Sequence, residues 1–219
     1  HYLGHHEGAS TLLDSMRTAY AGAEAFLRPE PAMPMPDLVR AVAVPPIAQT
    51  GTVRRAELAR RLRLAPGARV VLVGLGGVPH ALPVADWPVV PGVHWLLPDA
   101  WPCARADMHP FAASGMAYAD MLASADALLT KPGYGSFVEA ACAGVPVLYL
   151  PRPDWPESPF LTDWLQARVA CLAIDEARLM RGDLADPLAA LWGQPSRAPV
   201  RATGADVAAR ILLDVAACA

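Results

Sequence analysis

Charge is scarce in this 219-residue chain. Only 18% of the residues are Asp, Glu, Lys or Arg, and Lys131 is the single lysine. The formal net charge is −3 and no basic run occurs, which argues against a protein that binds nucleic acid through its phosphates. No apolar stretch reaches the roughly 18–20 residues of a membrane-spanning helix, and no signal peptide is evident. Hydrophobic residues make up 54% of the chain, which is enough for a buried core.

Cysteine is also sparse, and no two cysteines have a metal-binding spacing such as C-x-x-C. The four are Cys103, Cys142, Cys171 and Cys218. A disulfide scaffold is therefore not expected, and a reducing cytoplasm is the predicted location. The segment His5-His6-Glu7 could hold a metal, but no third ligand stands at a useful spacing, and a polar start of the chain is the favoured interpretation. We therefore predict neither a metal nor a cofactor.

Short apolar runs alternate with amphipathic segments along the chain, which predicts an α/β fold. The predicted strands are 40–44, 69–73, 93–97, 127–129, 147–150 and 169–174. The predicted helices are 10–26, 54–64, 118–124, 136–143, 160–167, 186–192 and 204–217, and 110–116 is predicted to be a loop. Strand–helix alternation favours a Rossmann-like open parallel sheet with helices on both faces.

A proline-rich segment near the beginning, Pro29 to Pro36, can be neither helix nor central strand. It is typical of an extended linker and is the best candidate for a domain boundary. We therefore predict two parts. Residues 1–36 would be the tail of a preceding domain together with the linker, and residues 37–219 would form the α/β domain.

The most informative stretch is residues 127–150, which predicts a strand, a glycine-rich loop, a helix and a second strand. Gly133 and Gly135 are expected to adopt positive φ and to let a ligand approach the backbone. The helix that follows offers unpaired N–H groups and its positive dipole end, which together favour a phosphate. Lys131 either neutralises that phosphate or reaches solvent from a strand end. Ser136-x-x-Glu139 also fits a capping box, in which both side chains only satisfy the helix end.

Two other loops are predicted to lie on the same rim of the sheet, after strands 69–73 and 147–150. The first contains Gly74, Gly76 and Gly77, and it is neither a G-x-G-x-x-G fingerprint nor a Walker A loop. A tight turn explains its glycines equally well. The second loop, residues 151–159, contains Asp154 and Glu157, which either face a ligand or serve as turn formers beside proline.

Residues 124–148, Ser-Ala-Asp-Ala-Leu-Leu-Thr-Lys-Pro-Gly-Tyr-Gly-Ser-Phe-Val-Glu-Ala-Ala-Cys-Ala-Gly-Val-Pro-Val-Leu, resemble the donor-binding motif of GT-B glycosyltransferases. The undecaprenyl-muramyl N-acetylglucosaminyltransferase and its UDP-sugar-using relatives are the most similar families. The form Lys-Pro-Gly-Tyr-Gly, followed by Asp-Trp-Pro-Glu at 154–157, is also similar to the glycosyltransferase-like part of L-arabinokinases. The resemblance extends from about residue 70 to 165. It implies one half of a GT-B fold that binds a nucleotide sugar.

In such families the glycine-rich loop and the helix N-terminus hold the donor diphosphate. That role falls here on Gly133, Tyr134, Gly135 and Ser136, with Lys131 and the glycines at 74, 76 and 77 nearby. The resemblance assigns Glu139 to the ribose hydroxyls and the loop with Asp154 and Glu157 to the sugar. Backbone groups at 98–101 would face the base.

The resemblance implies a fragment of a glycosyltransferase that takes a hexosyl group from a nucleoside-diphosphate sugar, most naturally a UDP-sugar. The acceptor, and usually the catalytic base, come from an N-terminal domain that is largely absent here. No catalytic residue is therefore named, and the chain alone is expected to transfer nothing. A nucleotide-sugar epimerase of the same fold and a non-catalytic nucleotide-binding or interaction domain are the alternatives. Association with a membrane is left open.

Overall fold

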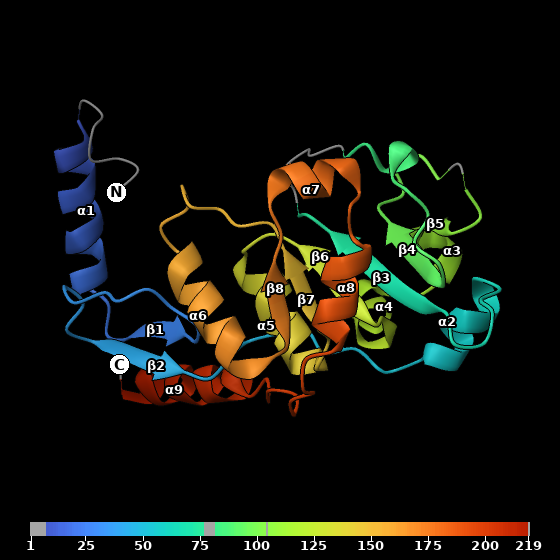
Figure 1. Cartoon of the computed structure of the whole chain (residues 1–219). Helices are drawn as coiled ribbons and strands as arrows, with labels where there is room; N and C mark the ends of the chain where they lie inside the picture. The colour runs from blue at the N-terminus through green and yellow to red at the C-terminus, as the bar shows by residue number, and fades with distance from the viewer. Residues whose placement is uncertain (1–7, 77–81, 104, 219) are drawn as a thin grey trace.

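The computed structural model describes residues 8–76, 82–103 and 105–218. A six-stranded sheet, with the strand order β5-β4-β3-β6-β7-β8, forms its centre (Figure 1). The strands are β3 (Arg69–Gly74), β4 (Val93–Leu97), β5 (Met108–Pro110), β6 (Ala127–Thr130), β7 (Val147–Tyr149) and β8 (Cys171–Ala173). All neighbours in this sheet pair in parallel. The predicted fold class is confirmed.

The order of the strands reverses once, between β3 and β6. From β3 the chain builds outward through β4 to β5, and it then returns to place β6 on the other side of β3. In an open parallel sheet, such a reversal separates two loops at the carboxyl ends of the strands and leaves a crevice between them. The described residues that directly follow β3 and β6 therefore lie beside this reversal, and they include Gly76 and Gly133.

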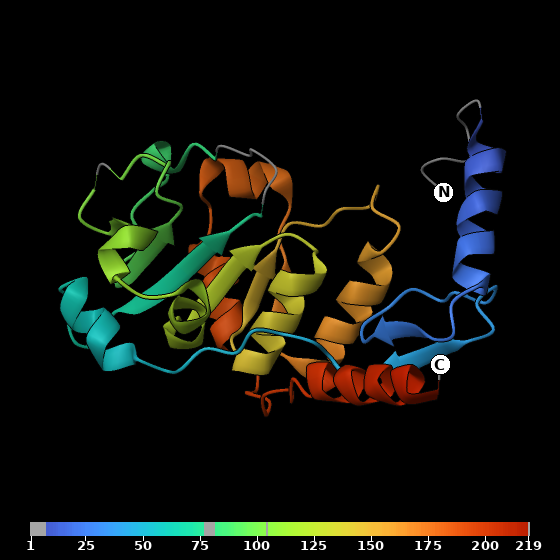
Figure 2. The ribbon, with the colours of Figure 1, turned by 180° about the vertical axis from the view of Figure 1, so that it is seen from behind.

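Helices cover both faces of the sheet and give two apolar cores (Figures 1 and 2). One core packs α7 (Glu176–Arg181), α8 (Ala185–Trp192) and the 3-10 turn η1 (Val84–Asp86) on one face. The other packs α2 (Arg55–Arg61), α4 (Tyr118–Ser124), α5 (Tyr134–Ala143) and α6 (Ser158–Arg168) on the other face. Strands β3 and β6 are buried on both faces, which explains their continuous apolar sequence.

A second, two-stranded parallel sheet is formed by β1 (Phe26–Pro29) and β2 (Ala41–Val44). Figures 1 and 2 show it at one end of the molecule with α1 (Ala9–Ala21) and α9 (Gly204–Cys218). The proline-rich segment is the crossover between these two strands. Nothing in this arrangement tests the predicted boundary at residue 36, which stays a prediction.

Two expectations about local structure were wrong, and one helix was not predicted. The helix predicted over 10–26 ends at Ala21, and Phe26 lies in β1, where its ring contacts Tyr20 at 5.2 Å between centroids. The loop predicted over 110–116 holds the end of β5 and the short helix α3 (Phe111–Ser114). A distant carboxylate explains this helix, because Asp99 Oδ1 accepts a 2.7 Å hydrogen bond from the Ala112 N–H. Helix α7 was not predicted.

Candidate functional site

The region at the strand reversal, between the carboxyl ends of β3 and β6, is called the crevice. Thr130, which is fully buried, donates its hydroxyl to the Gly74 carbonyl oxygen at 2.6 Å and ties the two strand ends together. Lys131 follows directly. A Cβ built on Gly76, whose φ is 68°, would lie 3.8 Å from the Lys131 Cε. The predicted neighbours Gly74, Gly76 and Lys131 are therefore brought together, whereas Gly77 lies outside the described residues.

Gly74 is glycine because Tyr118 occupies the space beside it. A Cβ at position 74 would lie 2.6 Å from the Tyr118 hydroxyl oxygen. Tyr118 begins α4, and its ring packs edge-on against Phe111 with centroids 6.0 Å apart. Burial, together with the charge of Glu139, raises the pKa of Tyr118 to about 12. Sequence reasoning missed this residue, since no pattern in the chain distinguishes it from an ordinary core aromatic.

Helix α5 begins two residues earlier than predicted, with Gly133 as its N-cap and Tyr134 as its first residue. Ser136 therefore lies inside the first turn, and the capping-box interpretation of Ser136 and Glu139 is wrong. The expectation of positive φ was also wrong. Gly133 is extended, with a φ of −161°, and Gly135 is not among the positive-φ residues.

The glycines instead leave the first turn of α5 uncovered. No atom lies within 4 Å of a Cβ built on Gly135, and the nearest to one on Gly133 is the Lys131 carbonyl oxygen at 3.9 Å. The first hydrogen bond of the helix runs from the Phe137 N–H to the Gly133 carbonyl oxygen at 3.1 Å. The N–H groups of residues 134–136 precede it and can bind an anion.

Two half-buried charged side chains line the same crevice. Lys131 loses solvent, which lowers its pKa, and the positive charge of Arg152 lowers it further. Glu139, one turn along α5, has its pKa raised by burial. Within the described residues neither side chain forms a hydrogen bond or an ion pair, and the Tyr118 hydroxyl also has no hydrogen-bond partner there. A cation, an anion and a hydroxyl are thus all available to a ligand.

Tyr134, which was expected to help hold a diphosphate, turns its side chain elsewhere. Its hydroxyl accepts a hydrogen bond from the Ile47 N–H at 3.1 Å and donates one to the Glu30 carbonyl oxygen at 3.2 Å. These contacts fasten the start of α5 to the segments that follow β1 and β2. Only the backbone of Tyr134 remains for a ligand at the crevice.

The loop after β7 places Asp154 and Glu157 on the same rim, one strand further along. The Trp155 Nε1 donates to Glu157 Oε2 at 3.4 Å, and the Arg152 guanidinium lies 4.8 Å from the Trp155 ring centroid. Asp154 is exposed and lines an open hollow of about 470 Å³ shared with Met33, Pro34, Pro153, Pro156 and Phe160. This loop therefore faces the proline-rich crossover. Whether Asp154 and Glu157 contact a sugar stays a prediction.

The structure resembles solved glycosyltransferases. Spinosyn forosaminyltransferase superposes with a TM-score of 0.52 at 20% identity over 88% of the chain and 51% of that structure. Calicheamicin glycosyltransferase superposes with a TM-score of 0.51 at 19% identity over 88% of the chain and 52% of that structure. The glycosyltransferase of kitacinnamycin superposes with a TM-score of 0.51 at 19% identity, over 71% of the chain and 42% of that structure. The chain has the fold of half a GT-B glycosyltransferase, and the resemblance seen in the sequence is confirmed at this level.

Among curated proteins, the chain is 27% identical to the L-arabinokinase of Arabidopsis thaliana over 150 residues. This match covers 67% of the chain and 14% of that protein, and the chain spans about half the length of the solved structures above. No protein-family model matches.

The part of the chain that the structure describes contains neither a cluster of metal ligands nor a membrane-spanning helix. There, no group of three or more His, Cys, Asp or Glu side chains is arranged to hold a metal ion. Likewise, none of the helices described is both long enough and apolar enough to cross a bilayer. The motif His5-His6-Glu7 lies outside the described residues.

Proposed function

We propose that the chain is the donor-binding half of a glycosyltransferase that transfers a hexosyl group from a UDP-sugar to an acceptor held by another domain of the same enzyme. One observation carries this proposal. At the strand reversal, Lys131, Glu139 and Tyr118 lose solvent without gaining a described partner, beside the free N–H groups of α5. A polar group that is removed from water without gaining a partner destabilises the folded state. A ligand of matching charge can supply the missing interaction when it binds.

The anionic part of the donor matches one side of the crevice. A diphosphate needs several N–H donors and a nearby cation, and residues 134–136 with Lys131 supply both. Since Gly133 and Gly135 carry no side chain, phosphate oxygens can approach the backbone of the first helical turn. The same groups would stabilise the diphosphate as negative charge develops on it during transfer.

The ribose of the nucleotide-sugar donor matches the other side of the crevice. Glu139 offers two carboxylate oxygens as hydrogen-bond acceptors, which suits the two hydroxyls of a ribose. The Tyr118 hydroxyl lies at the end of β3, and the charge of Glu139 contributes to its raised pKa. Together the two side chains present an acceptor and a donor to the same ligand. We assign no catalytic base, because the proposed acceptor domain would provide it, and the chain alone would transfer no sugar.

The relatives add support of a general kind. Three solved structures with this fold are named as glycosyltransferases, and the L-arabinokinase match covers 67% of this chain. Cys103, Cys142 and Cys171 form no disulfide, which fits the reducing cytoplasm that we propose as the location of the protein.

Calorimetric titration of the chain with UDP, TDP, GDP and ADP tests the proposal. We expect UDP to bind most tightly, with a dissociation constant at or below about 1 mM, which corresponds to roughly 4 kcal/mol. Glu139→Gln should weaken UDP binding by about tenfold. Glu176→Gln is the matched control, because that carboxylate is exposed in the first turn of α7 on the other face of the sheet. If none of the nucleotides binds at millimolar concentration, the proposed function is wrong.

A further inference from the structure

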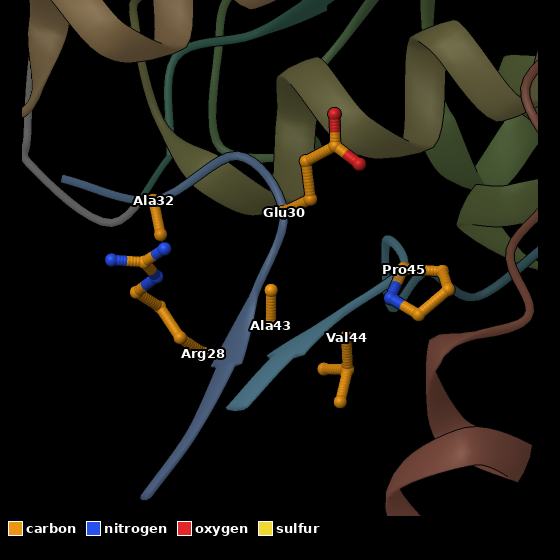
Figure 3. Close-up of a pocket in the computed structure, with 6 residues that line it drawn as sticks. All are labelled: Arg28, Glu30, Ala32, Ala43, Val44 and Pro45. Carbon is orange, nitrogen blue, oxygen red and sulfur yellow. The ribbon is translucent and has the colours of Figure 1, made fainter. Parts of the chain in front are cut away.

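A second hollow lies at the small sheet, away from the strand reversal. It has a volume of about 330 Å³ and is lined by Arg28, Glu30, Ala32, Ala43, Val44 and Pro45 (Figure 3). Arg28 belongs to β1 and pairs in register with Ala43 of β2. Glu30 and Ala32 come from the beginning of the proline-rich crossover. The walls other than Arg28 and Glu30 are small and apolar.

The two charged residues of this hollow differ in what they bind. The Glu30 carboxylate accepts hydrogen bonds from Trp164 Nε1 at 2.8 Å and from Arg168 at 3.0 Å, so α6 already satisfies it. Figure 3 shows the Glu30 side chain directed away from Arg28. Within residues 8–76, 82–103 and 105–218, the half-buried Arg28 forms no hydrogen bond, ion pair or ring contact. Its guanidinium is the unsatisfied group of the hollow.

The other half-buried arginines of the described residues all have partners. Arg54, Arg55, Arg105 and Arg178 pair with carboxylates, and Arg152 stacks on Trp155. Arg28 is the exception among them, because its partly exposed guanidinium has no partner in the described residues and is open to a ligand that offers hydrogen-bond acceptors.

The hydrogen-bond donors available in the hollow determine which kind of ligand it can bind. A guanidinium presents parallel N–H groups that match the two oxygens of a carboxylate in one plane. A phosphate would need further donors, and three of the neighbouring backbone positions supply none. Pro31 and Pro45 have no N–H group, and the Glu30 N–H is bonded to the Val44 carbonyl oxygen at 2.9 Å. Apolar Ala32, Ala43 and Val44 suit a short hydrocarbon body.

We propose that the Arg28 hollow binds a small aliphatic carboxylate, with the Arg28 guanidinium holding the carboxylate and the Ala32–Ala43 wall contacting its alkyl part. The proposal rests on the hollow and on Arg28, and it does not depend on the binding of a nucleotide. The hollow nevertheless adjoins the proposed donor site through Glu30, whose carbonyl oxygen accepts a hydrogen bond from the Tyr134 hydroxyl.

Titration of the chain with acetate, propionate and butyrate tests this site, followed by the NMR amide signals of Ala32 and Ala43. Ionic strength is held constant with chloride. We expect saturable shifts at these two amides and an affinity that rises about threefold per added methylene, because each methylene contacts the apolar wall. The amide signals of Gly133 and Gly135 should not move, which separates this site from the donor site.

Variants decide which group is responsible. Arg28→Gln should weaken butyrate binding by about tenfold or more, since it removes the positive charge and the paired hydrogen bonds to the carboxylate. Ala43→Leu should abolish binding, because it fills the hollow while it keeps Arg28. Arg40→Gln is the matched control, since Arg40 is exposed near the same sheet and already donates to the Ala23 carbonyl oxygen and to Glu24. Binding in the control should equal that of the wild-type chain.

Three results would overturn the proposal. They are shifts that never saturate, butyrate binding by Arg28→Gln that equals the wild type, and inorganic phosphate binding that matches butyrate. The last result would show that the hollow recognises negative charge and not a carboxylate. Because UDP titration reports on different amides, loss of this proposal and loss of the proposed function are distinguishable.

Discussion

Two clusters of charged side chains in this molecule differ in how their charges are satisfied. The first cluster joins α2 to α4. Arg54 bonds Glu57 at 2.6 Å and Asp120 at 3.2 Å, and Glu57 also bonds Arg61 at 2.8 Å. The second cluster is the crevice at the strand reversal, where Lys131 and Glu139 have no described ion-pair partner.

The pKa shifts of the two clusters have opposite signs. In the α2–α4 cluster, hydrogen bonds to Asp120 and Glu57 raise the pKa of Arg54, and bonds to arginine lower the pKa of Glu57, so the charged forms are favoured. In the crevice, burial lowers the pKa of Lys131 and raises that of Glu139, so the neutral forms are favoured. Paired charges stabilise the fold, whereas the crevice keeps its charges for a ligand.

The geometry that creates the crevice can be broken directly. Gly74→Ala places a methyl group 2.6 Å from the Tyr118 hydroxyl oxygen at the end of a buried strand. We expect a loss of about 1–3 kcal/mol in the free energy of unfolding, measured by urea denaturation. The double variant Gly74→Ala with Tyr118→Phe should recover part of this loss, since the clashing oxygen is gone. Equal losses in both variants would refute the explanation of Gly74.

The contrast between the clusters predicts opposite outcomes for two substitutions. Lys131→Gln should weaken UDP binding by about tenfold without lowering the midpoint of urea unfolding, because the lysine gains nothing from the fold. Asp120→Asn should lower that midpoint and leave UDP affinity unchanged, because Asp120 binds Arg54 and the Thr52 N–H but not the ligand. Denaturation and calorimetry of both variants check this. A stability loss in Lys131→Gln would remove the distinction.

Tyr118 offers a smaller and sharper test of the ribose side. Tyr118→Phe removes one hydroxyl and keeps the ring contact with Phe111. We expect UDP affinity to fall about three- to tenfold, as for loss of one hydrogen bond, while the unfolding midpoint stays unchanged. Phe111→Leu serves as the control for packing, since it should change stability more than affinity. If UDP affinity does not change in Tyr118→Phe, the hydroxyl does not contact the ligand.

A third polar cluster, His94 with His109, predicts the pH dependence of stability. Their rings stack at 5.2 Å between centroids, and His94 Nδ1 lies 3.0 Å from His109 Nε2. Burial lowers the pKa of both; Asp107 opposes this shift, and the charge of Arg55 adds to it at His94. The unfolded chain, with His pKa values of about 6.5, therefore binds more protons than the folded chain.

The stability contributed by this pair should be complete above about pH 6.5 and should be lost as the pH falls below it. Urea unfolding at a series of pH values from 5 to 8 measures the effect. In His94→Phe the slope in this range should be smaller than in the wild type. An unchanged slope would show that other groups cause it.

Much of the fold could be predicted because local pattern and burial agree. The buried strands at 69–74 and 127–130 are continuous apolar runs, and Tyr118 to Ser124 was predicted with its observed bounds. Prediction failed where a distant group decides the outcome. The start of α3 depends on Asp99, and the end of α1 at Ala21 leaves Phe26 to pair with β2.

The candidate site shows the same division. Lys131, Gly133 to Ser136 and Glu139 were found from one contiguous motif, whose position after a strand fixes which rim of the sheet it occupies. Tyr118 was not found, because its role depends on the approach of α4 to the end of β3. The redirection of the Tyr134 side chain toward Glu30 and Ile47 was likewise invisible, since those residues are about 100 positions away in the chain.

The sequence by itself determined the α/β class, the strand–loop–helix at 127–150 and the supply of N–H groups and charges around it. Periodicity and glycine placement act over a few residues, so one chain without relatives reveals them. Only the tertiary structure decided which of those charges lack partners. It set Lys131, Glu139 and Tyr118 apart at the strand reversal and Arg28 apart in its hollow, because pairing depends on contacts between segments that sequence order does not specify.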